Sequence, residues 1–167
     1  MLRIYANTWG NYNQNGANRG EWITLPDYDL EDTLEALAEK MGDSDPEWFV
    51  NDYEWMSAVN FGPVSENSSF NDLNELCETL EGLDQWELEK LEAILEGHTN
   101  NVQEALEELE DAIFYPGMDL EEVAEEIIEE CYDLPEFARR YFDYAAFGRD
   151  LGFDGYTETS KGVICVF

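Results

Sequence analysis

The chain has 167 residues and a mass of 19.3 kDa, which suits one ordinary domain or a few small ones. Hydrophobic residues make up 44% and aromatic residues 14%, so the composition excludes a disordered acidic tail. Forty acidic residues against eight basic ones give a formal net charge of −32, which excludes nucleic acids and anionic membranes as partners and favours a cationic one.

The first third of the chain mixes strand and helix patterns. Residues 2–8 and 20–25 carry β-branched and aromatic residues at near-alternating positions, and a segment rich in Gly and Asn lies between them, so they predict two antiparallel strands joined by a loop. Residues 29–42 predict a helix with its leucines on one face. The aromatic segment 48–55 fits either a short helix or a strand, and both possibilities stay open.

A loop at residues 60–69 is the candidate domain boundary, and the pattern beyond it is mostly helical. Apolar residues recur at spacings of three and four in four acidic segments, which predicts helices at 71–83, 84–96, 101–111 and 119–133. A short strand and turn at 112–117, a further helix at 136–151 and a terminal hairpin at 155–167 complete the expected elements.

The segment 119–133, DLEEVAEEIIEECYD, contains eight acids and no base. On a helix its apolar residues span an arc of about 140°, and all eight acids fall on the complementary arc. Like charges four residues apart weaken a helix, so the buried face must stabilise this one. A face made only of carboxylates therefore indicates a function.

The same imbalance extends over the middle of the chain, since residues 41–138 contain 29 acids and only one base, Lys90. Eight acids over residues 119–133 cover about 21 Å of helix, near one charge per 3 Å. One DNA strand carries a phosphate per about 3.4 Å. This similarity predicts that the helices imitate DNA towards a DNA-binding protein. Self-repulsion and mimicry both favour an elongated molecule.

The candidate functional residues are the carboxylates on the outer faces of these four helices. Because the charge is distributed, we expect one neutralisation to cost little and neutralisation of a whole helix to cost much. The predicted DNA-mimic surface comprises Asp72, Glu75, Glu78, Glu81, Asp84, Glu87, Glu92, Glu96, Glu104, Glu107, Glu108, Asp111, Asp119, Glu121, Glu122, Glu125, Glu126, Glu129, Glu130 and Asp133.

Simpler causes of such acidity fit this sequence less well. An ordinary solvated face mixes both signs of charge, and adaptation to high salt predicts acids throughout, whereas both ends of this chain retain Arg and Lys. A calcium buffer lacks its characteristic loop sequence here. The main alternative to a DNA mimic is an acidic interaction or chaperone-like module that binds basic proteins.

The sequence does not favour an enzyme. Its single histidine, His98, follows a glycine at a predicted helix end, and one histidine with three scattered cysteines cannot form a usual zinc site, so neither a metal nor a cofactor is expected. Cys77 and Cys131 fall on apolar positions of helical patterns, which predicts buried free thiols and a reducing compartment. With neither a signal-peptide pattern nor a long apolar run, we expect a cytoplasmic protein.

Two blocks near the ends of the chain are distinctive: IYANTWGNYNQNGANRGEWITLP at 4–26 and DLPEFARRYFDYAAFGRDL at 133–151. Both resemble the ArdA family of antirestriction proteins. The first resembles the family's opening, an apolar strand, W/LGKYN, a loop and G-x-W-F, and the second resembles its most specific block, Y-[FI]-D-Y-x-A-[YF]-[GA]-R-D-L. The resemblance spans essentially the whole chain, although the central helices match only in being acidic.

The resemblance implies an α+β fold, an elongated, curved chain of three small domains with highly acidic amphipathic helices. These are an N-terminal α/β domain at 1–60, a central acidic helical domain at 61–111, and a C-terminal α+β domain at 112–167 with a dimerisation helix and a terminal hairpin. It implies a homodimeric DNA mimic, carried by mobile genetic elements, that competes for the DNA-binding groove of type I restriction-modification enzymes in the cytoplasm of a bacterial host cell.

The family block implies a second group of candidate residues. Its aromatic, amphipathic pattern favours the core or the dimer interface over contact with the target. Arg139 and Arg140 form a basic pair where the family block is more neutral, and they could neutralise acids across the subunit interface. The block comprises Arg140, Tyr141, Phe142, Asp143, Tyr144, Phe147, Arg149, Asp150 and Leu151.

Overall fold

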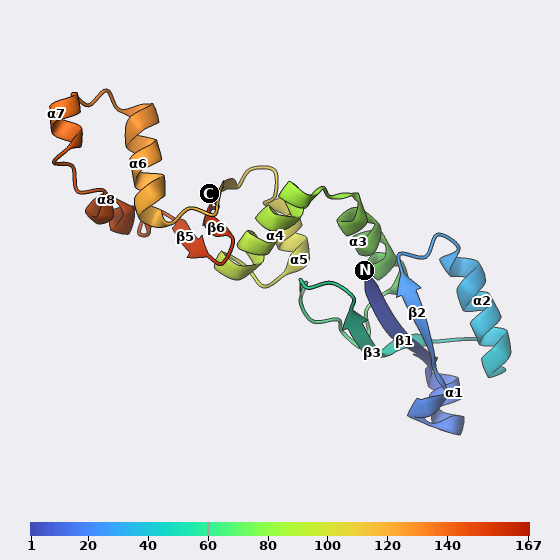
Figure 1. The fold of residues 1–167 in the computed structure, drawn as a ribbon. Coiled ribbons are helices and arrows are strands. Elements are labelled where there is room, and N and C mark those ends of the chain that lie inside the picture. The colour runs from blue at the N-terminus through green and yellow to red at the C-terminus, as the bar shows by residue number, and fades with distance from the viewer. Residues whose placement is uncertain (60) are drawn as a thin grey trace. The chain divides into compact units, whose positions relative to one another are not determined.

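The computed structural model describes residues 1–59 and 61–167, and the chain divides into two compact units, Met1–Leu83 and Asp84–Phe167. The described residues form eight α-helices, one 3-10 helix and two antiparallel three-stranded sheets, one sheet in each unit (Figure 1). This confirms the α+β class. The division into three domains stays a prediction.

The sheet of the first unit has β1 (Leu2–Thr8) at its centre, between β2 (Glu21–Leu25) and β3 (Trp48–Trp55). Both pairings are antiparallel, which confirms the predicted strand pair and identifies the aromatic segment 48–55 as a strand. Alternation along β1 sends Leu2, Ile4 and Ala6 into the core.

A helix occupies the segment between β1 and β2, so the prediction of a loop there is wrong. Helix α1 (Trp9–Asn15) is followed by the 3-10 helix η1 (Ala17–Arg19). The Thr8 hydroxyl accepts a hydrogen bond from the Asn11 amide at 3.1 Å and thereby caps the helix. The Trp9 ring stacks on Phe49 of β3 with 4.1 Å between ring centroids. This tertiary contact overrides a local composition that is typical of turns.

Two helices pack on the core of this sheet. Gly42, in the left-handed conformation, caps the end of helix α2 (Leu30–Met41). Ser69 caps the start of helix α3 (Phe70–Gly82), where its hydroxyl accepts a hydrogen bond from the Asp72 amide. Since α3 packs into the same core, the loop at 61–69 lies within the first unit, and Asn60 lies outside the described residues. The buried cluster comprises Leu2, Ile4, Ala6, Ile23, Leu25, Leu30, Val50, Phe70, Leu73 and Cys77.

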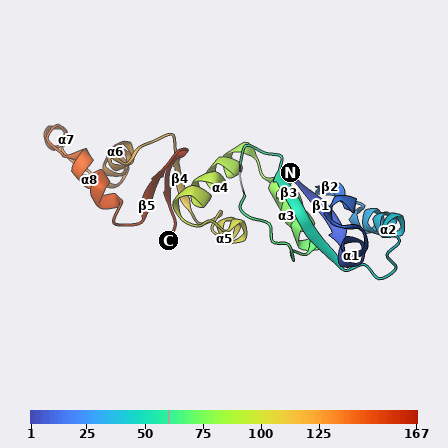
Figure 2. The same ribbon diagram turned by 90° about the horizontal axis from the view of Figure 1, so that it is seen from below.

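The second unit begins with α4 (Gln85–Gly97) and α5 (Val102–Glu107), which lie side by side in Figures 1 and 2. The predicted helix at 101–111 therefore ends four residues early, in turns. The sheet of this unit has the order β4 (Ile113–Pro116), β6 (Gly162–Cys165) and β5 (Tyr156–Thr159), which confirms the terminal hairpin. Helix α4 contacts all three strands.

Three helices follow β4, where two were predicted. Helix α6 (Leu120–Cys131) agrees with the prediction, whereas the single helix expected at 136–151 is divided into α7 (Glu136–Arg139) and α8 (Tyr144–Leu151). The Asp143 carboxylate accepts a hydrogen bond from the Ala146 amide at 2.9 Å, so a capped new helix begins in the middle of the predicted one.

Helices α6 and α8 pack closely against each other. A Cβ atom at Gly148 would lie 2.6 Å from the Leu120 carbonyl oxygen, so only glycine permits this approach. The hydrophobic cluster on α6 contains Val123 and Ala124, but Cys131 is exposed, and its predicted burial is therefore wrong. Cys131 is the last residue of α6, beyond the part of the helix that this cluster covers.

Candidate functional site

Helix α6 begins with a reciprocal pair of hydrogen bonds made by two acids. The Asp119 carboxylate accepts from the Glu122 amide at 2.9 Å, and the Glu122 carboxylate accepts from the Asp119 amide at 3.0 Å. Their negative charges also lie at the positive end of the helix dipole. Two of the predicted mimic residues therefore help to form the helix that carries the others.

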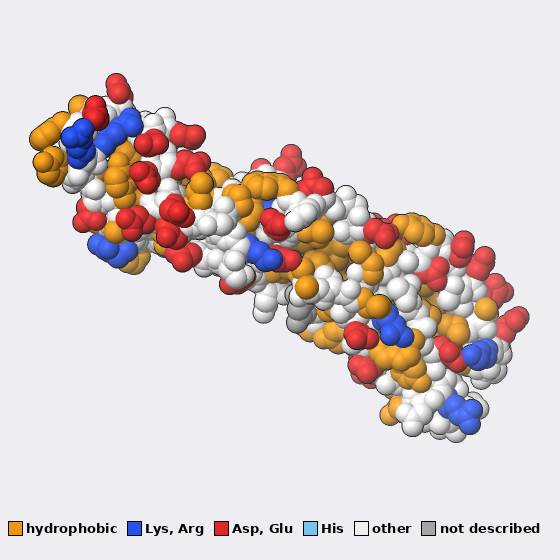
Figure 3. Space-filling model, in the orientation of Figure 1, with side chains coloured by type: hydrophobic (Ala, Val, Ile, Leu, Met, Phe, Trp, Pro, Cys, Tyr) orange, Lys and Arg blue, Asp and Glu red, His pale blue; other side chains and the backbone are white. Residues whose placement is uncertain are grey.

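The outer face of α6 is coated with carboxylates. Glu121, Glu125, Glu129 and Glu130 are exposed and Glu126 is half-buried, while the opposite face buries Val123, Ala124 and Ile128. Figure 3 shows acidic side chains gathered over this segment. Among the described residues α6 has one ion pair, from Glu129 to Arg139 at 3.6 Å. Most of the charge on this face is thus left without a basic partner.

The four predicted residues of α3 are likewise exposed, on the first unit: Asp72, Glu75, Glu78 and Glu81. The Glu78 carboxylate accepts from the Asn74 amide group at 2.9 Å, and Glu81 accepts from the Tyr28 hydroxyl at 2.9 Å. The hydrogen bond that Tyr28 donates to Glu81, and the negative charge of Glu81, both raise the pKa of Tyr28. These bonds hold two of the four carboxylates in place without neutralising them.

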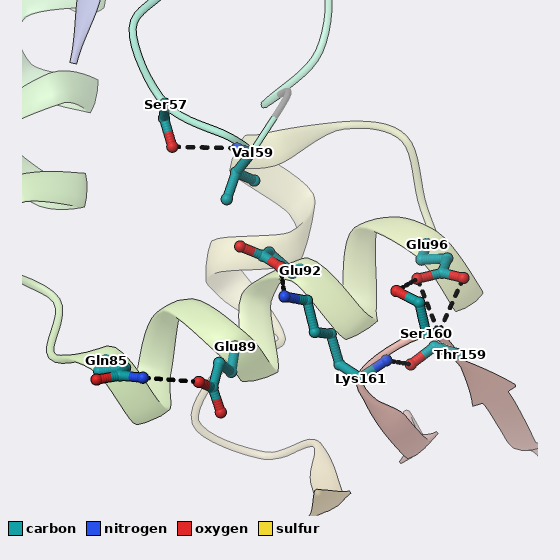
Figure 4. Close-up of polar contacts among 9 residues, drawn as sticks. All are labelled: Ser57, Val59, Gln85, Glu89, Glu92, Glu96, Thr159, Ser160 and Lys161. Atoms are coloured by element: carbon teal, nitrogen blue, oxygen red, sulfur yellow. Dashed lines mark hydrogen bonds and ion pairs between the residues drawn. The ribbon is translucent and has the colours of Figure 1, made fainter. Parts of the chain in front are cut away.

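Two predicted mimic residues of α4 instead bind the terminal hairpin (Figure 4). Glu92 forms an ion pair with Lys161 at 2.7 Å, and Glu96 accepts hydrogen bonds from the Ser160 amide at 3.0 Å and from its hydroxyl at 2.6 Å. The Ser160 bonds lower the pKa of Glu96, and the bond to Glu92 raises the pKa of Lys161. These two carboxylates therefore hold the terminal hairpin against α4 in addition to contributing negative charge to the surface.

Of the other predicted residues of the second unit, some accept hydrogen bonds that stabilise the fold and the rest have no such partner among the described residues. Asp84 and Glu87 form the reciprocal capping bonds of α4, and Glu104 accepts from the Thr99 hydroxyl at 2.6 Å. Burial lowers the pKa of Lys90, while the charge of Asp111 opposes that shift. The other positions are exposed at Glu107, Asp111 and Asp133 and half-buried at Glu108.

The predicted acidic surface is therefore exposed but divided between the two units. None of its residues is buried, and only four are half-buried: Glu87, Glu92, Glu108 and Glu126. Asp72 to Glu81 lie on the first unit, and Asp84 to Asp133 lie on the second. Among the described residues of this predicted surface, the outer face of α6 is the largest group on one element that lacks basic partners.

Three aromatic residues of the family block pack against one another, and one of them, Phe147, packs on the hydrophobic cluster of α6. The Phe142 ring lies 5.0 Å from Tyr144 and 5.9 Å from Phe147 between centroids, and Phe147 packs on the cluster that contains Leu151. Asp143 caps α8, while Arg149 and Asp150 are exposed. These contacts give most of the block a structural role within one chain.

Helix α7 presents a different surface. Phe137 and Tyr141 are 75% and 77% exposed, and their rings lie 5.4 Å apart. Figure 3 shows hydrophobic side chains over α7 with basic ones beside them. Both arginines have partners within the chain, since Arg140 pairs with Glu136 at 2.6 Å and Arg139 with Glu129.

Gly148 sets the approach of α8 to α6, and the helical pattern did not predict this role. A signal was present, because Gly148 occupies the [GA] position of the family block.

His98 is the exposed residue that follows α4, as expected. Within residues 1–59 and 61–167, no group of three or more His, Cys, Asp or Glu side chains is arranged to hold a metal ion. No helix in the same residues has the length and apolarity that crossing a membrane requires.

Comparison with known proteins gives one family. A family model described as antirestriction protein (ArdA) matches residues 4–165. A search of curated proteins finds no match. Proteins of the matching family are non-enzymatic inhibitors, which confirms the prediction that the chain is not an enzyme. Because the match runs from residue 4 to residue 165 of the 167, the chain belongs to the ArdA family of antirestriction proteins.

Proposed function

We propose that this antirestriction protein is a DNA mimic that occupies the DNA-binding groove of a type I restriction-modification enzyme. The observation that carries the proposal is the outer face of α6. Seven acids from Asp119 to Glu130 extend over about 17 Å of helix, close to one charge per 3 Å. A single DNA strand presents a phosphate per about 3.4 Å to the same enzyme.

Inhibition by mimicry involves no chemical step. The carboxylates meet the lysine and arginine side chains that normally hold phosphates, and the bound protein excludes the DNA. Because ions are released from both charged surfaces on association, the affinity falls as the salt concentration rises, as it does for DNA. The inhibitor acts wherever the restriction enzyme does, in the cytoplasm of the bacterial host.

The homodimer is part of this proposal. The exposed Phe137 and Tyr141 of α7 support it, since an exposed pair of large aromatic rings is typical of an interaction surface. A second copy would cover this surface. The test is the mass in solution by light scattering: the wild type should be a dimer, and Phe137→Ser with Tyr141→Ser should be a monomer. A monomeric wild type would contradict this part of the proposal.

A restriction-protection assay tests the function. Plasmid DNA is treated with a type I enzyme and increasing amounts of the chain, and binding of the chain to the enzyme is measured without DNA at several salt concentrations. A mimic protects the plasmid once its amount matches that of the enzyme, and its own affinity for the enzyme falls at high salt. A module for basic proteins in general would instead bind a histone-like protein as tightly as the enzyme. Unprotected plasmid at every ratio would contradict the proposed function.

A further inference from the structure

A groove in the first unit lies between α2 and the segment that leads into β3. It has a volume of about 340 Å³. Three groups of residues line it: apolar side chains from both walls, the acids of one helix edge, and the loop after Gly42. The lining comprises Leu34, Glu35, Ala38, Glu39, Asp43, Ser44, Pro46 and Trp48.

The floor of this groove is apolar and its rim is anionic. Leu34, Ala38 and Trp48 are buried or half-buried, whereas Glu35 and Glu39 are exposed. Spaced four residues apart, the two glutamates lie along one edge of α2, where their repulsion weakens the helix. Among the described residues neither carboxylate has an ion-pair or hydrogen-bond partner.

The other wall adds a third fixed charge. The Asp43 carboxylate accepts hydrogen bonds from the Thr8 hydroxyl at 2.6 Å and from the Asp45 amide at 3.3 Å. These neutral donors orient the carboxylate and leave its charge in place. The one base of α2, Lys40, does not line the groove and pairs with Glu21 beside a different cavity.

We propose that this groove binds one arginine side chain of the restriction enzyme that the protein inhibits. An arginine side chain has an apolar stem, which suits the floor, and a weakly hydrated planar cation, which suits Trp48 and the carboxylates. Because the rim is negatively charged, a cationic side chain fits the groove better than an anionic or a neutral one. The groove thus adds a shaped anchor to a surface that otherwise offers distributed charge. The source of the arginine rests on the proposed function, but binding of the side chain itself does not.

The first arm of the test uses the intact chain alone. The probe is Nα-acetyl-arginine amide, with the neutral isostere Nα-acetyl-citrulline amide as its control, and amide chemical shifts are followed by NMR. The arginine compound should cause saturable shifts confined to residues 34–48, with a dissociation constant on the order of 1 mM, and the citrulline compound should not. Shifts that spread over all acidic helices without saturating would overturn the proposal.

Two variants localise the effect. Glu35→Gln with Glu39→Gln should weaken binding about tenfold, as suits the loss of two partly solvated charges. Glu39→Lys should abolish it by placing a cation at the rim, and circular dichroism verifies the fold of both. The matched control, Asp52→Asn with Glu66→Gln, removes two exposed charges of the same unit outside the groove and should bind like the wild type. Equal binding by all variants would overturn the proposal.

The second arm uses the restriction-protection assay with the same variants. The groove variants should protect DNA several-fold less well than the matched control. If the wild type protects DNA and the groove variants protect it equally well, the groove proposal fails and the proposed function stands. If the wild type does not protect DNA, the proposed function fails, and the groove is then judged by the NMR titration alone.

Discussion

Neutralising the outer face of α6 should reduce inhibition while making the protein more stable. The variant replaces Glu121, Glu125, Glu126 and Glu130 by glutamine. It keeps Asp119 and Glu122, whose mutual hydrogen bonds begin the helix, and Glu129, which pairs with Arg139. Glutamine preserves the size and the helix propensity of the side chain, so charge is the main property that changes.

The two effects have opposite signs. Four like-charge contacts at a spacing of four residues disappear, each worth about 0.2–0.5 kcal/mol, so the free energy of unfolding should rise by about 1 kcal/mol. Each lost contact with a basic side chain of the enzyme costs about 0.2–1 kcal/mol, so four cost about 2 kcal/mol. Inhibition should therefore require about 30 times more protein, since about 1.4 kcal/mol corresponds to a factor of ten.

Urea unfolding measures the stability, and the restriction-protection assay measures the inhibition. A matched control removes four exposed acids of the first unit that belong neither to the predicted mimic surface nor to the groove: Glu31, Glu47, Asp52 and Glu66. This control should inhibit within a few-fold of the wild type. Equal loss of inhibition in the two variants would refute the assignment to α6, and unchanged inhibition in both would refute phosphate mimicry by this helix.

Individual contacts in each unit lead to three more expected results. The pKa of Glu96 is lowered, so the stability contributed by its hydrogen bonds is present above the ordinary pKa of 4.5 and is lost as the pH falls through the lowered pKa. The amide resonance of Ser160 should therefore titrate below pH 4.5, and a midpoint at or above 4.5 would contradict this. Cys131 should react with a thiol reagent within minutes, whereas Cys77, whose burial raises its pKa to about 11, should react only on unfolding; equal rates would show that the α3 core is open. Gly148→Ala should cost about 1–3 kcal/mol in the free energy of unfolding, because its Cβ would lie 2.6 Å from the Leu120 oxygen, and an unchanged urea midpoint would show that α6 and α8 adjust freely.

Much of the fold could be predicted because its helices carry regular apolar stripes. Helices α2, α4 and α6 begin and end within two residues of the predicted positions, since their stripes and caps lie within one short segment. Helix α1 could not be predicted in this way. It depends on the stacking of Trp9 on Phe49, a contact between residues 40 positions apart, and its own Gly and Asn content favours turns.

The division of the predicted helix at 136–151 had a local signal that periodicity obscured. Asp143 belongs to the family block, but an aspartate at this position is also typical of a helix start, and it caps α8. The continuing pattern of aromatic residues on both sides favoured one helix. Phe147 of α8 instead packs on the cluster of α6, and Phe142 contacts both Phe147 and Tyr144.

The acidic surface could be predicted in part. Exposure of the predicted carboxylates follows from the apolar stripes, and the structure leaves none of them buried. The partners of Glu92 and Glu96 could not be predicted, because Ser160 and Lys161 are more than 60 residues away in the chain. The groove beside α2 could not be predicted either, since its walls come from a helix and a loop whose relative position depends on tertiary packing.

Mimicry of DNA by this chain can be tested by a competition titration. A fluorescent derivative of the chain is bound to the type I methyltransferase core, and unlabelled duplex DNA with the enzyme's recognition sequence is added. If the chain and DNA share one groove, the apparent dissociation constant of the chain rises in proportion to the DNA concentration, without a limit. A dissociation constant that reaches a plateau, with chain and DNA bound to the enzyme together, would contradict mimicry.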